Sequence, residues 1–531
     1  MDKKRLKLKK FYFHPVTVFI FLTFLIVIVS GIASLFEMQA NYKEVNIDTY
    51  ELGYSNLVSV YNFLSIEGFK QMFSNAMTNF LSFAPLGTLL VSLIGLAIAE
   101  GTGLIEAFSK KYIKRMPNWL LTFLVIFISI MSSLINEVGY AILIPLVALI
   151  YFINGRNPIL GIVTTFCGVA FGCGTSIFVG STDIALRDYT ESAARVIDPA
   201  YHVALSSNLI FIVISTIIIS IVGTIIIEKI MVNKIGHYKR EEEESKTEQY
   251  RVINYEEEEQ KKLEREKNEK RGLRYALVVT ILLMLVYIYS LIPGLPSSGI
   301  LLNSSAKAYV DQLFGEKAYF QQSFTYMVAI YFILTGIAYG IGSKSIKNDK
   351  ELWNNTSSKF KNIGELILLM FIFSQFIAIY RDSNIGKILT TYLASLLETL
   401  KLSGIPLIIV TMIFIAIGNI IYTGTASKWM IFSPVVVPMF MQSNITPEFA
   451  QAVMRSGMSM TNGVTPFLAS FVIYIGYLNI YNLNKEKPYT IRESLKLVTP
   501  YFGLISLAWI LLIIGWYLIG APLGAGALPT L

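Results

Sequence analysis

The chain has 531 residues, of which 54% are hydrophobic and only 15% are charged, with a net charge of +8. Soluble proteins carry about 25% charged residues, so this composition excludes an ordinary soluble enzyme and a disordered chain and predicts repeated membrane spans. The net positive charge does not indicate a nucleic acid partner. The charges of the acidic and basic residues in 228–274 cancel, so the excess of positive charge lies in short basic loops elsewhere. The positive-inside rule predicts such loops between membrane spans. The two cysteines and three histidines share no ligand spacing, so we expect no cofactor and no metal site other than one for Na⁺.

The first apolar run, at about 15–36, follows a basic start and is too long for the core of a signal peptide. It predicts a membrane helix with a cytoplasmic N-terminus, in a multi-pass protein of the plasma (inner) membrane. Further apolar segments, each long enough to span or enter the bilayer, fall at about 72–100, 118–152, 158–183, 203–227, 275–294, 322–343, 362–380, 405–441, 447–479 and 497–518.

Two of these segments, 118–152 and 405–441, are long and have a polar, glycine-containing middle. The arm that follows each middle, 140–152 or 429–441, has 13 residues and reaches only ~20 Å, whereas the hydrocarbon core is about 30 Å thick. These lengths favour two re-entrant hairpins over two pairs of full spans. The distribution of basic loops cannot distinguish the two arrangements, because both place those loops on the same side of the membrane. We therefore predict an all-α integral membrane protein with about nine transmembrane helices and two hairpins.

The stretch 228–274 interleaves glutamate runs with lysine and arginine. It predicts a solvated cytoplasmic connector that is helical or partly disordered. The connector divides the chain into an N-terminal half, 1–227, and a C-terminal half, 275–531. Each half contains one hairpin followed by a broken helix, at 158–183 in the first and at 447–479 in the second.

Proline and glycine recur at the same intervals in the two halves. At a constant offset of 289 residues, Pro145, Pro158, Gly168 and Gly174 correspond to Pro434, Pro447, Gly457 and Gly463. When the spans are counted, the first hairpin enters from the cytoplasm and the second from outside. The sequence therefore predicts inverted repeats, an arrangement typical of many secondary transporters.

Glycine and polar residues interrupt the helices that follow the hairpins, with Thr175 and Ser176 in the first and Thr461 and Asn462 in the second. Free backbone carbonyls are tolerated at membrane depth only where they are buried in protein or line a cavity, and beside hydroxyl and amide oxygens they suit a small hard cation. We predict an ion or substrate site at these interruptions. For glycines such as Gly168, close helix packing is an equally good explanation.

Ionisable residues inside the predicted spans are costly unless each faces a cavity or a partner, and here they are Glu100, Glu137, Asp183, Lys428 and Arg455. Lys428 and Arg455 suit a carboxylate ligand, and Trp429 offers an aromatic face. Lys428 has the alternative of snorkelling to the interface. For Glu137 and Asp183 three roles stay open: binding Na⁺, carrying a proton, or pairing with a basic residue. Glu100 is best explained as interfacial, because glycines end its helix.

The sequence lacks a nucleotide-binding glycine loop, a potassium-selectivity filter and a nucleophile elbow. It also lacks a pairing of nucleophile and base, so we expect no enzyme activity. Because the sequence shows no nucleotide-binding loop, an ion gradient of Na⁺ or H⁺ is the expected source of energy.

A set of short motifs runs in order along almost the whole chain. The hairpins contribute Glu137-Val138-Gly139-Tyr140 and Lys428-Trp429. Other motifs fall at 144–146, 155–161, 180–183, 269–274, 336–340, 374–378, 383–386, 437–440 and 522–526. In these motifs the sequence resembles the p-aminobenzoyl-glutamate transporter (AbgT) family of the ion transporter superfamily.

The resemblance implies a homodimer with nine membrane helices and two hairpins per protomer, and a cavity that faces the cytoplasm. It implies cation-driven movement of p-aminobenzoyl-glutamate or export of sulfonamide-like antimetabolites. By position, the residues that match those lining the family's transport path are Asp183, Asn419, Trp429, Pro447 and Arg455. With Lys428, they are the expected substrate-binding residues. Three positions depart from the family's usual residues: Ser176, Ala426 and Met458.

The sequence as a whole predicts a secondary active transporter of a small organic anion, working by alternating access of the hairpin and broken-helix units against a dimeric scaffold in the lipid bilayer. Arg455 and Lys428 would hold the anion, and Trp429 would stack on it. The residues that would bind the cation or proton are Asp183, Asn136, Glu137, Thr175, Ser176, Thr425 and Asn462. The alternatives are a transporter of another carboxylate and a passive channel, which re-entrant inverted repeats disfavour. The direction of transport and the choice between Na⁺ and H⁺ stay open.

Overall fold

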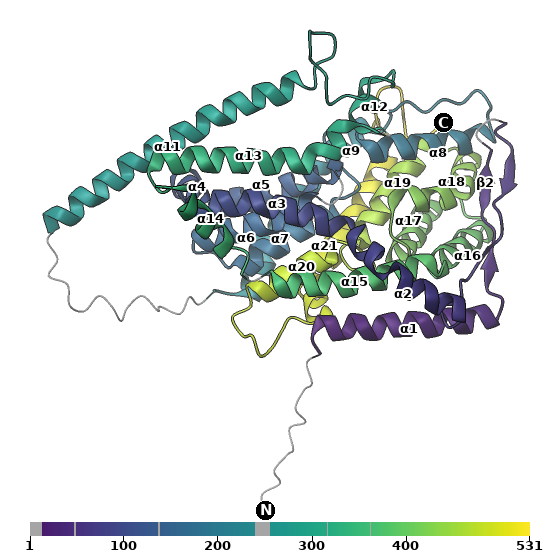
Figure 1. Ribbon diagram of the computed structural model, residues 1–531. Coiled ribbons are helices and arrows are strands. Elements are labelled where there is room, and N and C mark those ends of the chain that lie inside the picture. The colour runs from purple at the N-terminus through teal and green to yellow at the C-terminus, as the bar shows by residue number, and fades with distance from the viewer. Residues whose placement is uncertain (1–12, 47–48, 136–137, 239–254, 316, 362) are drawn as a thin grey trace, which may run out of the picture.

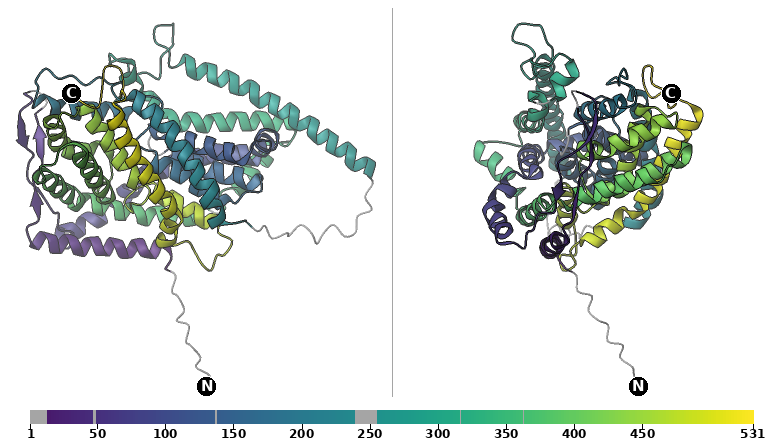
Figure 2. Two further views of the ribbon diagram at one scale, coloured as in Figure 1. Left: turned by 180° about the vertical axis from the view of Figure 1, so that it is seen from behind. Right: turned by 90° about the vertical axis from the view of Figure 1, so that its right-hand side faces the viewer.

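The computed structural model describes residues 13–46, 49–135, 138–238, 255–315, 317–361 and 363–531, and helices make up most of it (Figures 1 and 2). The helices of the N-terminal half are α1 (Pro15–Leu35), α2 (Ile66–Leu81), α3 (Ala84–Gly101), α4 (Leu104–Phe108), α5 (Asn118–Met131), α6 (Ile144–Ile153), α7 (Pro158–Phe171), α8 (Ser181–Arg195), α9 (Leu209–Ile226) and α10 (Val232–Ile235). Short 3₁₀ or π-helical segments adjoin them at Ser109–Ile113, Ser132–Ile135, Gly139–Leu143 and Ile227–Met231.

The helices of the C-terminal half are α11 (Tyr255–Tyr289), α12 (Tyr309–Phe314), α13 (Tyr319–Ser343), α14 (Asp349–Ser358), α15 (Gly364–Asp382), α16 (Ile385–Thr399), α17 (Gly404–Ile421), α18 (Thr425–Gln442), α19 (Pro447–Thr461), α20 (Phe471–Ile480) and α21 (Ile491–Ile519). Four short strands follow α1 at one end of the bundle (Figure 1): β1 (Gln39–Ala40), β2 (Lys43–Val45), β3 (Leu52–Tyr54) and β4 (Val58–Ser59). They pair antiparallel as β1 with β4 and β2 with β3.

In the part of the chain that the structure describes, nine helical stretches are long and apolar enough to cross a membrane. They are Pro15–Leu35, Ile66–Gly101, Asn118–Ile135, Leu209–Ile235, Lys262–Tyr289, Tyr319–Ser343, Gly364–Asp382, Gly404–Ile421 and Ile491–Ile519. The expected class, an all-α membrane protein, is thus confirmed. The set of nine differs from the expected one, because it includes the first arms of both expected hairpins and omits 158–183 and 447–479. Each of those two segments is broken into shorter helices, since glycine and hydroxyl residues interrupt its apolar run.

α7 and α19 lie at the centre of the molecule. Every residue of both helices is buried. They have 14 and 15 residues and are only ~21 and ~23 Å long, which is shorter than the hydrocarbon core. Because both helices are buried, the backbone groups freed at their ends meet protein and not lipid. Both begin with the same chemistry: the side chains of Asn157 and Thr446 cap the first turn, and a proline occupies the first helical position of each.

The same glycine contact occurs in the two halves. A Cβ placed on Gly168 of α7 would lie 3.3 Å from Cα of Ile126 in α5. A Cβ placed on Gly457 of α19 would lie 3.2 Å from Cβ of Ile415 in α17. Close packing therefore accounts for both glycines. The constant offset of 289 residues relates the glycines and also the isoleucines that they contact.

α7 and α19 begin next to different parts of the chain. Before α7, Asn157 Nδ2 donates to the Gly236 carbonyl just after α10 (3.1 Å). Before α19, the Thr446 amide donates to the Pro529 carbonyl in the C-terminal tail (3.0 Å). The first helix therefore starts beside the end of α10 and the second beside the tail.

These two starting points are far apart. Leu523 of the tail accepts a hydrogen bond from the Phe211 amide at the start of α9 (3.0 Å), whereas Gly236 follows the other end of the same helical stretch, Leu209–Ile235. This stretch has 27 residues and is ~40 Å long. α7 and α19 therefore begin at opposite ends of the molecule.

The first expected hairpin returns to the end from which it starts. Arg156, just after α6, donates from Nη1 to the Asn118 carbonyl at the start of α5 (3.3 Å) and to Thr122 Oγ1 (3.1 Å). The predicted cation ligands Asn136 and Glu137, which belong to its tip, lie outside the described residues.

Two boundaries differ from the expected ones. α8 begins at Ser181 and runs to Arg195, so Asp183 lies in a first helical turn and not at the end of an apolar span. Hydropathy could not reveal this helix, because it is polar. The charged connector 228–274 is also divided: its start continues α9 through α10, and its last part belongs to α11, which carries on as the next membrane helix.

Candidate functional site

A buried ion pair joins the two halves of the chain. Arg455, near the middle of α19, pairs through Nη2 with Oδ1 of Asp183 in the first turn of α8. Both side chains are less than a tenth exposed. Asp183 Oδ2 also accepts the Gly180 amide (2.6 Å), and the N-terminus of α8 stabilises its negative charge. Two charges that lie 272 positions apart in the sequence are thus brought together.

Arg455 keeps unused hydrogen-bonding capacity. Its Nη1 donates to the Gly174 carbonyl in the loop between α7 and α8 (3.3 Å). Its Nε is buried and has no hydrogen-bond partner among the described residues. A buried, unpaired donor on a charged group costs more than about 1 kcal/mol. A carboxylate or another acceptor placed against this edge of the guanidinium would remove that cost.

A small cavity lies beside the ion pair. Its volume of about 20 Å³ holds one particle the size of a water molecule. The oxygen-bearing residues that line it include Ser133, Thr175, Ser176, Ser181, Thr182 and Asp183, and Arg455 lines it too. The Thr175 hydroxyl donates to the Gly172 carbonyl (3.1 Å). The Ser176 hydroxyl donates to the Phe178 carbonyl and accepts from the Phe178 amide (3.2 Å), so each of the two oxygens keeps at least one lone pair that can accept. Three predicted cation ligands, Thr175, Ser176 and Asp183, therefore meet here.

A second polar cluster lies at the start of α18. Lys428 is 1% exposed, which excludes snorkelling in this conformation, and its Nζ donates to Asn419 Oδ1. Asn419 Nδ2 in turn donates to the Met458 carbonyl (3.1 Å) and to Thr461 Oγ1 (3.2 Å), near the end of α19. Within the described ranges no carboxylate pairs with Lys428. A buried ammonium without a counter-ion favours the arrival of an anion.

Thr425 and Asn462 belong to this second cluster. Thr425 Oγ1 lies 3.0 Å from the Met458 sulfur, and Asn462 follows the last residue of α19 as its cap. From Arg455 to Asn462 the helix rises ~10 Å. The predicted cation ligands that the structure describes are therefore divided between two places, one beside Asp183 and one beside Asn419.

Trp429 does not face a cavity. Its ring is fully buried, and Nε1 donates to Thr190 Oγ1 of α8 (2.8 Å). Thr190 also accepts from Gln451 Nε2 (3.3 Å), and Asn208 Nδ2 donates to Gln451 Oε1 (2.5 Å). In this conformation the indole fastens α18 to α8 instead of presenting an open aromatic face. Thr190, Gln451 and Asn208 were not predicted from the sequence; the available signal was their polar character within or next to apolar segments.

Pro447 lies away from the ion pair. It occupies the first position of α19, eight residues before Arg455, which corresponds to ~12 Å along the helix. In this structure it begins the helix, for which its fixed φ is suited.

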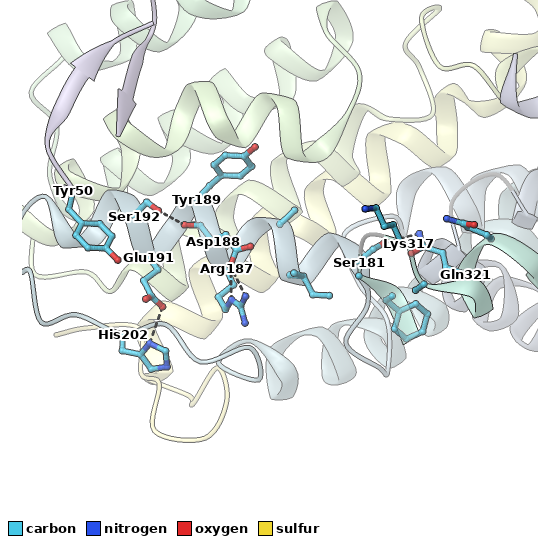
Figure 3. A pocket seen from close by; sticks show the side chains of 16 residues that line it. Tyr50, Ser181, Arg187, Asp188, Tyr189, Glu191, Ser192, His202, Lys317 and Gln321 are labelled. Carbon is cyan, nitrogen blue, oxygen red and sulfur yellow. Dashed lines mark hydrogen bonds and ion pairs between the residues drawn. The ribbon is translucent and has the colours of Figure 1, made fainter. Parts of the chain in front are cut away.

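A large cavity of about 1030 Å³ lies along α8. Figure 3 shows Arg187, Asp188 and Glu191 along it, with Lys317 at its other end. The acidic groups have partners: Asp188 pairs with Arg187 (2.6 Å), and Glu191 pairs with Arg195 and with His202. Ser181 lines both this cavity and the small one, so the two adjoin at the start of α8.

The large cavity lies away from the basic loops. Lys317 and Ala318, which line it, directly precede α13, whereas the basic loop with Lys344 follows the other end of that helix. α13 has 25 residues and is ~37 Å long. The large cavity is therefore at the opposite end of α13 from this basic loop.

The comparison with family models decides what kind of protein this is. The model described as "AbgT putative transporter family" matches residues 9–531. The chain belongs to the AbgT family. AbgT proteins are transporters, so the expectation of a membrane transporter without enzyme activity is confirmed.

Individual AbgT relatives match over nearly their whole length. The p-aminobenzoyl-glutamate transport protein of Escherichia coli (strain K12) is 27% identical over 519 residues, which cover 98% of this chain and 94% of the relative. Among solved structures, the Alcanivorax borkumensis YdaH transporter is 27% identical, covers 96% of this chain and 100% of its own, and has a TM-score of 0.45. Neisseria gonorrhoeae MtrF, described with a class of antimetabolite efflux pumps, is 29% identical with 98% of both chains covered and a TM-score of 0.46.

The contact between the two AbgT halves can be tested at Gly174. A Cβ at this position would lie 2.5 Å from both the Arg455 carbonyl oxygen and Ser459 Oγ. We expect Gly174→Ala to push the loop away from α19, to cost about 1–3 kcal/mol of stability, and to lower transport. Thermal denaturation in detergent measures the first effect.

A matched control is Gly503→Ala, because an added Cβ in this part of α21 meets nothing within 4 Å. Replacing a glycine inside a helix raises stability by up to about 1 kcal/mol. If both variants denatured at the wild-type temperature or above, the close approach at Gly174 would be wrong.

Proposed function

We propose that this AbgT protein is a secondary active transporter of a small organic anion, with p-aminobenzoyl-glutamate as the first candidate. The observation that carries the proposal is the buried Arg455, which has one carboxylate partner, an unpartnered Nε and a cavity at its side. The name of the Escherichia coli relative supports the choice of substrate. Other carboxylates remain the alternative substrates.

Two buried cations suit a substrate with two carboxylates. Arg455 and Lys428 are each less than a twentieth exposed, and Lys428 has no carboxylate partner among the described residues. The glutamate part of p-aminobenzoyl-glutamate carries two carboxylates. Charge-assisted hydrogen bonds to each of them would be stronger than bonds between neutral groups. Trp429 would act in this scheme by holding α18 against α8.

Coupling to a cation follows from competition for Arg455. A substrate carboxylate that takes Nη2 displaces Asp183, and a buried carboxylate without its partner is costly. Na⁺ bound beside Thr175 and Ser176, or a proton on Asp183, would remove that cost, and the small cavity has room for such a particle. Substrate and cation would therefore bind together. Among the other predicted cation ligands, Thr425 and Asn462 would serve a second site.

Access would alternate between the two sides of the membrane. Helices α7 and α19, which begin at opposite ends of the molecule, support an inverted repeat of the kind that many secondary transporters use. The large cavity along α8 would be the entrance from one side. We further propose a homodimer in the plasma membrane, with a cytoplasmic N-terminus.

The test is flux through purified full-length protein in liposomes. Labelled p-aminobenzoyl-glutamate and simple dicarboxylates are offered separately under an inward Na⁺ gradient, a pH gradient, or neither. We expect one gradient to drive accumulation of p-aminobenzoyl-glutamate above equilibrium, and empty liposomes to show none. Reversing the gradient shows whether the protein works in both directions.

Other outcomes would contradict the proposal at different points. Gradient-driven flux of dicarboxylates alone would keep the mechanism and change the substrate. Flux that stops at equal concentrations under every gradient would indicate a passive channel. No flux of any offered anion would overturn the proposed function.

A further inference from the structure

An apolar groove with a basic end lies on the outside of the molecule, away from the ion pair. Four elements bound it: α4 with the segment Ser109–Ile113, α6, α11 and α13. Its volume is about 640 Å³. Figure 1 shows α11 and α13 side by side, with α4 close to them. We call this feature the basic groove.

Apolar side chains form most of the basic groove. Leu146 of α6, Leu277 of α11 and Phe332 of α13 represent three of its walls. Leu277 is more than half exposed. An exposed apolar surface within a predicted membrane span faces lipid, because the bilayer and not the protein covers it.

Three basic side chains also line the groove: Lys111, Lys270 and Arg274. All three are exposed. Within the described part of the chain, none of them forms an ion pair with a carboxylate; Lys111 Nζ lies over the ring of Tyr112, 5.0 Å from its centre. Their charge is therefore available to an external anion.

Lys270 and Arg274 share a face of α11 with the apolar lining. They lie at positions i and i+4, and Leu273 and Leu277 lie at i+3 and i+7, so one stripe of the helix carries the charges followed by the leucines. One ligand with a charged head and an apolar chain would contact both parts of this stripe.

From the placement of its basic residues, we infer that the charged end of the basic groove lies at the level of the lipid headgroups. Lys270 and Arg274 belong to the first half of the membrane-spanning stretch Lys262–Tyr289. The neighbouring Arg271 donates from Nε to the Gly342 carbonyl (2.5 Å), next to the basic loop that follows α13. The charged end therefore lies at the edge of the bilayer, on the side where basic loops gather, and anionic lipids are attracted to such clusters.

We propose that the basic groove binds one anionic phospholipid from the surrounding leaflet. Its phosphate would contact Lys111, Lys270 and Arg274, and an acyl chain would lie against Leu146, Leu277 and Phe332. Charge complementarity favours this occupant over a neutral lipid, and the apolar walls favour it over free phosphate. A lipid held here would join α11 to α4 and α6, and so to the first hairpin.

Native mass spectrometry of the full-length protein tests this proposal. Protein in detergent is mixed with phosphatidylglycerol, phosphatidylcholine or inorganic phosphate, and retained adducts are counted. We expect the wild type to retain phosphatidylglycerol at least about tenfold better than phosphatidylcholine. The combined variant Lys111→Gln, Lys270→Gln and Arg274→Gln should lose that preference.

Two further variants separate the charges from the groove. The combined variant Lys347→Gln, Lys350→Gln and Lys361→Gln removes the same number of exposed charges elsewhere on the basic side, and it should keep the preference. Leu277→Trp fills the groove without changing charge and should reduce adducts of phosphatidylglycerol.

Three results would overturn the proposal. One is equal loss in both charge variants, which would indicate a diffuse effect of net charge. A second is retention of inorganic phosphate as strongly as phosphatidylglycerol. The third is a shift of Leu277→Trp from dimer to monomer with unchanged lipid adducts, which would assign the groove to a second copy of the chain.

Discussion

Arg455→Gln is expected to abolish anion transport by this AbgT protein. The guanidinium is the group that would bind the substrate carboxylate, and losing two charge-assisted hydrogen bonds corresponds to about 3 kcal/mol or more, which is at least a hundredfold in affinity. The measurement is gradient-driven uptake of p-aminobenzoyl-glutamate into liposomes, with the initial rate normalised to the amount of reconstituted protein.

The same substitution affects folding, and this effect has to be separated. Removing one member of a buried ion pair costs about 3–5 kcal/mol, because Asp183 stays buried without its partner. The double variant Asp183→Asn, Arg455→Gln removes both charges and should recover much of the stability without recovering transport. Arg381→Gln, an exposed arginine paired with its neighbour Asp382, is the matched control and should transport normally. A stable double variant with wild-type uptake would show that Arg455 does not bind the substrate.

Asp183→Asn is expected to keep substrate binding and to lose its dependence on the cation. In the proposed mechanism, substrate and Asp183 compete for Arg455, so cations that neutralise Asp183 should tighten substrate binding. Affinity should therefore rise with Na⁺ concentration if the cation is Na⁺, and should rise as pH falls if it is a proton. An asparagine is already neutral, so in the variant p-aminobenzoyl-glutamate should bind at least about tenfold more tightly than in the cation-free wild type, and equally at all cation concentrations.

Calorimetric titration of purified protein at varied Na⁺ and at varied pH measures this effect. Asp349→Asn, which neutralises an exposed carboxylate at the start of α14, is the control and should retain the wild-type dependence. A cation dependence that is the same in Asp183→Asn and the wild type would place the coupling elsewhere, with Thr425 and Asn462 as the next candidates.

The sequence by itself determined the class of protein and most of its spans. Stretches such as Pro15–Leu35 and Ile491–Ile519 are predictable because a helix of that length and apolarity has no stable place outside a bilayer. The offset of 289 residues was also visible, since proline and glycine have few substitutes where a helix starts or where helices touch. The paired contacts of Gly168 with Ile126 and of Gly457 with Ile415 give that offset its physical meaning.

The tertiary structure decided the site. Asp183 and Arg455 each stood out as a charge within an apolar segment, but only the packing of α8 against α19 shows that the two side chains pair with each other. The start of α8 was also hidden, because hydropathy cannot register a polar helix that is stabilised by packing against other helices. Trp429 was predicted as an open aromatic face, and its ring is instead buried against Thr190. The sequence identifies a residue that is costly in a membrane; which group offsets that cost depends on contacts between segments hundreds of residues apart.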